Sequence, residues 1–199
     1  MERLFVKLED IVRDSPLLMR ALTGARELNA PDWLIVSGAI YQTVLNALTF
    51  RPHDCGIKDF DLFYFDGSDL SYEAEDLRIQ RVRAIFAQDI ADRVELRNQA
   101  RVHLWFQEKF GEPYEPLGST EESLLRFVSP IGAVGVRLEA NGALTIVAPF
   151  GLEDLFALHM RPNPIRRLSP QFAAIAGGVR ARWPEVTMIN EAGAFPAGR

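Results

Sequence analysis

The 199-residue chain has little cysteine, little histidine and no long apolar run. Its single cysteine, Cys55, cannot form an intrachain disulfide, and no second cysteine accompanies His53 to make a zinc site. No apolar stretch approaches the roughly 20 residues that span a bilayer. The first residues also lack the charged-then-apolar pattern of a signal peptide. We therefore expect a cytoplasmic protein without a membrane partner.

The chain also lacks an excess of positive charge. It has 22 Lys and Arg residues against 27 Asp and Glu residues, which gives a formal net charge of -5. Surfaces that bind nucleic acids are usually basic, so a nucleic-acid partner is not expected. The content of 48% hydrophobic and 25% charged residues is typical of a globular chain that buries a sizeable core.

Apolar spacing, caps and turn residues predict an α/β chain with one domain: N-terminal helices within residues 1–30, a core of about 33–183 and a loose tail at 190–199. Helices are predicted at 4–12, 16–27, 39–48, 72–88, 152–160 and 170–183. Strands are predicted at 33–36, 58–65, 93–96, 134–138 and 144–147, the last two joined by an Asn-Gly turn. Residues 98–109 fit either a continued strand or a helix.

Two carboxylates stand in the predicted strand 58–65. Asp59 and Asp61 are two residues apart, so they share one face of the strand, while Phe60 and Leu62 lie on the other. Like charges in an apolar strand are costly unless a partner compensates them. A Mg²⁺ or Mn²⁺ ion held by the two carboxylates and by substrate phosphates would do so. The alternatives are two solvent-facing aspartates on an edge strand, or an ion pair with Lys58.

Two further segments could complete such a site. Ser37 and Gly38 join a strand to a helix through small residues, and such a turn lets backbone N–H groups approach a phosphate. Small residues at these junctions also serve packing. Glu95 lies in the predicted strand 93–96, where it could be a third metal ligand or a general base. It could equally be an exposed residue beside its neighbouring arginines.

Arg97 and Arg101 could clamp phosphates, and they share a face if the strand continues to residue 101. The alternative is that both are surface arginines paired with nearby acids. We expect the aromatic residues Trp105 and Phe106 to build core rather than to contact a ligand.

Several motifs occur together in an order and spacing that are specific to one family. They occupy residues 37–40, 59–66, 98–105, 148–156 and 161–164. Through them the chain resembles the bacterial nucleotidyltransferase-like proteins of the polymerase-beta superfamily. The resemblance implies the nucleotidyltransferase fold, a short mixed β-sheet backed by helices, with the carboxylates on adjacent strands and with helices added at both ends.

The resemblance also implies metal-dependent transfer of a nucleoside monophosphate from a nucleoside triphosphate (NTP). We expect the acceptor to be a hydroxyl group of a small molecule or a protein. Catalysis and metal binding would fall to Asp59, Asp61 and Glu95, and NTP binding to Ser37, Gly38, Arg97 and Arg101. The alternatives are a catalytically degenerate protein of this fold that binds a nucleotide or a protein, and a metal-dependent phosphohydrolase.

Overall fold

The computed structural model describes residues 2–166, 169, 171–190 and 193–194. A mixed five-stranded sheet with the order β3-β2-β1-β4-β5 forms its centre. β2 and β3 are parallel, and the other neighbours are antiparallel. The strands are β1 (Leu34–Val36), β2 (Phe60–Tyr64), β3 (Val94–Asn98), β4 (Gly135–Leu138) and β5 (Leu144–Val147).

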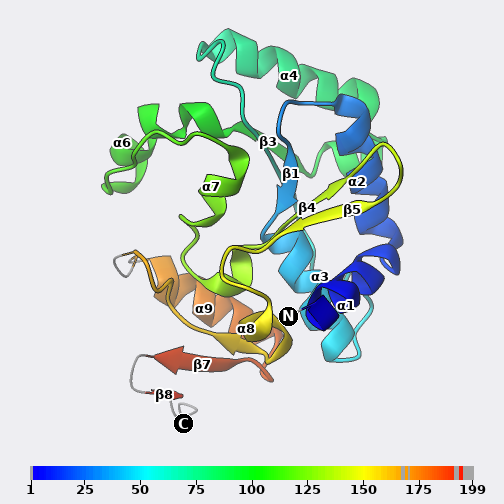
Figure 1. Ribbon diagram of the computed structural model, residues 1–199, viewed down its shortest axis with the longest axis vertical. Coiled ribbons are helices and arrows are strands. Elements are labelled where there is room, and N and C mark those ends of the chain that lie inside the picture. The colour runs from blue at the N-terminus through cyan, green and yellow to red at the C-terminus, as the bar shows by residue number, and fades with distance from the viewer. Residues whose placement is uncertain (1, 167–168, 170, 191–192, 195–199) are drawn as a thin grey trace.

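Helices lie on both sides of this sheet. Figure 1 shows α1 and α2 on one side and α6 and α7 on the other, with α9 and α8 below the sheet. None of the described helices is long and apolar enough to cross a membrane. They are α1 (Glu2–Arg13), α2 (Pro16–Leu28), α3 (Gly38–Leu48), α4 (Tyr72–Ile85), α5 (Gln88–Ala91), α6 (Phe106–Phe110), α7 (Thr120–Leu124), α8 (Glu153–Phe156) and α9 (Gln171–Arg182), with 3-10 helices at Gln99–Leu104 and Pro130–Gly132.

The helix starts follow the capping residues of the sequence. The Ser15 hydroxyl accepts a hydrogen bond from the Leu18 N–H at 3.3 Å, and Pro16 begins α2. The Ser71 hydroxyl accepts one from the Ala74 N–H at 3.2 Å at the start of α4. These caps confirm the predicted starts of both helices.

The two faces of the sheet differ in how they are covered. The side chains of Phe60, Leu62 and Tyr64 in β2 belong to the large core cluster, which α1, α2 and α3 complete. The other face of the sheet carries a much smaller cluster, in which Leu34 and Val36 meet Leu124 of α7. Asp61 alternates with Phe60 and Leu62 and therefore faces the thinly covered side.

Strand register brings separate parts of the sequence to one place. Val36 in β1 pairs with Asp61 in β2, and Asp61 in turn pairs with Glu95 in β3. Because Ser37 follows Val36 directly, the turn before α3 lies next to the strand that carries the carboxylate.

The predicted helix at 152–160 was too long. α8 ends at Phe156, and Leu158 has a φ of 56°, in the left-handed region that stops a helix. His159 and Met160 then form β6, which pairs in parallel with β7 (Thr187–Asn190). The second sheet, in which β8 (Gly193–Ala194) follows β6 and β7, was not predicted, because it joins a two-residue strand to a distant segment.

Other expectations need smaller corrections. The predicted helix at 72–88 is divided into α4 and the short α5, because Phe86 leaves helical geometry with a ψ of 147°. The open question over residues 98–109 is resolved in favour of helical structure. In the predicted loose tail, Gly193–Ala194 forms β8 against β7, and the rest from residue 191 lies outside the described residues.

One buried side chain ties the segments around the carboxylate strand. Asn46 of α3 donates to the carbonyls of His53 and Cys55 at 3.0 and 2.8 Å, and its Oδ1 accepts from Trp183 Nε1 at 2.9 Å. It thereby links α3, the loop that leads to β2, and the residue after α9.

We expect Asn46→Ala to lower the free energy of unfolding by about 3 kcal/mol, because the buried Trp183 N–H and two partly buried backbone carbonyls lose their partner. Trp183→Phe removes one donor and leaves a small cavity, so it should cost about 2 kcal/mol. Urea denaturation measures both. Equal losses for the two variants would contradict the linking role of Asn46.

Candidate functional site

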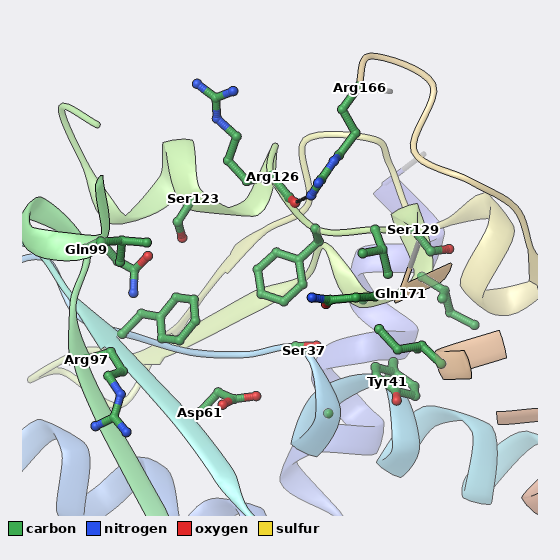
Figure 2. Close-up of a pocket in the computed structure, with 18 of the residues that line it drawn as sticks. Ser37, Tyr41, Asp61, Arg97, Gln99, Ser123, Arg126, Ser129, Arg166 and Gln171 are labelled. Carbon is green, nitrogen blue, oxygen red and sulfur yellow. Dashed lines mark hydrogen bonds between the residues drawn. The ribbon is translucent and has the colours of Figure 1, made fainter. Parts of the chain in front are cut away.

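A cavity of about 440 Å³ lies over the thinly covered face of the sheet (Figure 2). It brings together five of the seven residues that the sequence predicted for a site, namely Ser37, Gly38, Asp59, Asp61 and Arg97. Glu95 and Arg101 do not line it. Residues that are 60 positions apart in the sequence therefore share one cavity, as the strand register requires.

The turn between β1 and α3 has an unusual backbone. Ser37 has φ 55° and ψ -115°, a conformation that glycine adopts easily and serine does not. Its N–H donates to the Val134 carbonyl at 2.9 Å, and its own carbonyl accepts from the N–H groups of Ile40 and Tyr41. These bonds hold the strained turn in place at the start of an 11-residue helix.

Glycine at position 38 keeps the turn close to the carboxylates. A Cβ at this position would lie 3.3 Å from Gln42 Nε2 and 3.9 Å from Asp59 Oδ1. On the other side of the turn, a Cβ at Gly132 would lie 3.4 Å from Ser37 Oγ. The helix N-terminus, with its free N–H groups, therefore faces the cavity beside Asp59 and without a bulky side chain.

The two aspartates make the cavity electrostatically unfavourable. The pKa of Asp61 is raised to about 7, first by burial and then by the negative charges of Asp59 and Glu95, against a smaller opposing effect of Arg97. A carboxylate with a pKa this high lacks an adequate positive partner among the described residues. The donor set fits a divalent cation that two carboxylates share with phosphate oxygens, as Mg²⁺ is commonly bound.

The described part of the chain does not form a metal cage by itself. Among the described residues, no group of three or more His, Cys, Asp and Glu side chains is placed to hold a metal ion. Glu95 is exposed and lies opposite Asp61 on the neighbouring strand, outside the cavity lining. The structure thus brings Glu95 near enough to affect the Asp61 pKa, but not into the same pocket.

The two predicted phosphate-binding arginines are separated. β3 ends at Asn98, whose side chain accepts from the Ala100 N–H and starts the 3-10 helix, so Arg101 leaves the face that carries Arg97. Arg101 forms a largely buried ion pair with Glu75 of α4 and donates to the Leu70 carbonyl. Arg97 lines the cavity, and its Nη1 donates to the Leu96 carbonyl at 2.8 Å.

Sequence reasoning missed the far wall of the cavity. Trp105 and Phe106, which were expected in the core, are half-buried, line the cavity and belong to neither hydrophobic cluster. The sequence held one hint of their position, because residues 98–109 fitted either a strand or a helix. In the structure the segment is helical, and the helical turn carries these rings away from the core and over β2 and β3. The other side chains on this wall include Gln99, Tyr114, Arg126, Phe127 and Arg166.

A profile of the nucleotidyltransferase family matches residues 23–188, which is most of the chain. No protein with a curated description matches significantly. The structure is similar to one solved by NMR and described as revealing a CCA-adding enzyme head domain, with a TM-score of 0.72, 23% identity, and coverage of 92% of this chain and 94% of that chain. At this identity the likeness shows a shared fold, which confirms the predicted one.

A second solved structure, described as tRNA-processing enzyme complex 3, has a TM-score of 0.42 and 20% identity, with 79% of this chain and 38% of that chain covered. A TM-score of this size supports no further statement. The family profile, by contrast, spans the Ser37 turn, both aspartates, Glu95 and the cavity wall. The chain therefore belongs to the nucleotidyltransferase family, whose reaction is the transfer of a nucleotidyl group.

Proposed function

We propose that this protein transfers a nucleoside monophosphate from an NTP to a hydroxyl group of a small molecule or protein, with the help of Mg²⁺ or Mn²⁺. The observation that carries the proposal is the position of Asp59 and Asp61. They lie together in the cavity, beside the N-terminus of α3, with the pKa of Asp61 raised to about 7.

The side chains around the cavity would divide the work as follows. Asp59 and Asp61 would hold the cation, which neutralises triphosphate charge when it is bound. The backbone N–H groups at Gly38 and the Ser37 hydroxyl would bind the terminal phosphates, and Arg97 would bind a phosphate once its guanidinium turns from the Leu96 carbonyl.

Glu95 is exposed and lies beside Asp61 but outside the cavity lining, so it would take up the proton of the attacking hydroxyl through water, and a role as a third cation ligand requires its side chain to turn toward the cavity. Arg101 is held by Glu75, so a phosphate-binding role for it requires that pair to open. The absence of a three-ligand cage in the described part of the chain favours a second candidate, a protein that binds a nucleotide without turnover.

Nucleotide binding tests the proposal directly. We expect Asp59→Asn/Asp61→Asn to weaken Mg²⁺-dependent NTP binding by at least 10-fold, because the cation loses both protein ligands. Isothermal titration calorimetry with each of the four NTPs measures this. The double change Asp10→Asn/Asp14→Asn removes the same charge from exposed positions and should leave binding unchanged.

Binding that needs no metal, or that survives the loss of both aspartates, would refute the cation site. Metal-dependent binding without release of pyrophosphate in the presence of candidate acceptors would favour the second candidate over transfer.

The raised pKa of Asp61 allows a prediction of how the free energy of unfolding depends on pH in the absence of metal. The folded-state pKa of Asp61 is above its unfolded value, so its contribution is favourable while it stays protonated and is lost as the pH rises through about 7. Between pH 5.5 and 8, with a chelator present, the free energy of unfolding should fall by about 2 kcal/mol more in the wild type than in Asp61→Asn. Parallel pH curves from urea denaturation would rule out a raised pKa.

The strained turn predicts opposite effects on stability and binding. Ser37→Gly should raise the free energy of unfolding by about 1 kcal/mol, because glycine accepts φ 55° and ψ -115°. Loss of the hydroxyl should weaken NTP binding about 10-fold. Ser37→Ala is the matched control, since it loses the hydroxyl but keeps the strain. If both variants bind NTP normally, the hydroxyl does not contact the nucleotide.

A further inference from the structure

Three aromatic side chains, Trp105, Phe106 and Tyr114, form an aromatic wall in the lining of the cavity. Trp105 and Phe106 have ring centroids 6.1 Å apart, and Phe106 and Tyr114 have centroids 4.5 Å apart. All three rings line the cavity, are half-buried and belong to neither hydrophobic cluster. Burial raises the pKa of Tyr114 to about 12, so its ring is uncharged at neutral pH. Clustered rings that face a cavity instead of the core are typical of a ligand site.

A buried polar group lies on the same wall. Gln99 is 2% exposed and lines the cavity, and among the described residues its carboxamide makes no hydrogen bond. Neither carboxamide atom is among the fully buried polar atoms of the described residues that lack a partner, so the group is open to the cavity, where a ligand can form hydrogen bonds with it. Figure 2 shows Gln99, Arg97 and Asp61 along one side of the cavity. A carboxamide offers a donor and an acceptor together, which suits the polar edge of a ring.

The in-line geometry of nucleotidyl transfer indicates which of the two substrates, the NTP or the acceptor, this wall would contact. In an in-line transfer, the attacking oxygen and the leaving oxygen lie on opposite sides of the phosphorus. If pyrophosphate leaves toward Ser37 and Gly38, the attacking hydroxyl must approach Asp61 from the other end of the cavity. Figure 2 shows Asp61 between Ser37 and the side that carries Arg97 and Gln99, and Trp105 of the aromatic wall lines a depression together with Arg97.

We infer that the aromatic wall binds the acceptor, and that the acceptor is a small molecule that carries its hydroxyl next to a planar aromatic ring. The inference rests on the proposed function. The acceptor oxygen forms a bond to the α-phosphorus, and the bond from that phosphorus to the bridging oxygen breaks. The electron pair leaves with pyrophosphate, and the hydroxyl proton passes by way of water to Glu95, which lies beside Asp61 but outside the cavity lining.

The structure also leaves room for an acceptor larger than the ring. Arg97 and Trp105 line both the cavity and a surface depression of about 690 Å³ that extends toward Tyr72 and Lys109. A substituent on the ring can therefore reach the surface beside Trp105, where the ammonium group of Lys109 lies 5.5 Å from the Trp105 ring centroid.

The three tryptophans of the chain provide the test. Trp33 and Trp183 are 5% and 1% exposed, and Trp183 donates to Asn46, whereas Trp105 faces the cavity. In ¹H–¹⁵N spectra of the full chain with Mg²⁺ and a saturating α,β-methylene NTP analogue, tyrosinamide and adenosine should shift the Trp105 indole peak saturably. The ring-free counterparts serinamide and ribose should not, and the other two indole peaks should stay fixed.

Variants test whether the ring-bearing probes bind at the aromatic wall. Phe106→Leu and Gln99→Leu should each weaken binding of the ring-bearing probes at least 5-fold. Phe110→Leu is the control on the same helix, because Phe110 contacts Phe106 with centroids 4.7 Å apart but does not line the cavity. Trp105→Leu assigns the peak.

Ring-bearing probes that shift the peak no more than the ring-free ones would overturn the inference. Competition between a ring-bearing probe and the NTP analogue would also overturn it, since the wall would then bind the base of the donor, and the proposed function would stand. Failure of the analogue to bind at all would remove the proposed function and this inference with it.

Discussion

The pairing of β2 with β1 and β3 decides what lies beside Asp61. Because β2 is flanked on both sides, its register places Val36 on one side of Asp61 and Glu95 on the other. A shift by one residue would turn both aspartates into the large core and expose Phe60 and Leu62. The burial of those apolar side chains, both almost fully covered, therefore holds the carboxylates on the cavity side. The same core fixes the Ser37 turn, because it begins where β1 ends.

Two features of the site act against stability. Asp61 is buried near the negative charges of Asp59 and Glu95, and Ser37 has a backbone conformation that suits glycine. Each would be costly in isolation, and each persists because the surrounding structure holds it. Asn46 contributes to that support by linking α3, the loop before β2 and Trp183. The buried carboxylate and the strained backbone both lie at one cavity, and this is a physical reason to regard the cavity as functional.

Much of the architecture follows from short-range patterns in the sequence. Ser15 and Ser71 mark helix starts through their own hydroxyl groups, and alternation in 60–64 separates core from cavity residues. What could not be predicted depends on distant partners. β6 is two residues long and exists because β7, 27 residues later, pairs with it. Leu158 ends α8 by adopting a left-handed conformation that leucine rarely takes.

The residues of the candidate site also fall into those that the sequence identified and those that it did not. Asp59, Asp61, Ser37 and Gly38 could be identified because strand periodicity and a turn of small residues are local signals. The aromatic wall could not, because its position depends on Asn98 ending β3 and starting a helical turn. That single change of direction moves Arg101 toward Glu75 and brings Trp105 and Phe106 over the cavity.

Net charge is a poor guide to this cavity. The chain carries -5 overall, yet Arg97, Arg126 and Arg166 line the same cavity as Asp59 and Asp61. Glu112 pairs with Arg166, and the Arg126 guanidinium lies 5.6 Å from the Tyr114 ring centroid. Positive charge at the rim and carboxylates at the base form a local field that can attract a triphosphate although the whole molecule is acidic. This local field is compatible with the small, ring-bearing acceptor that we infer for the same cavity.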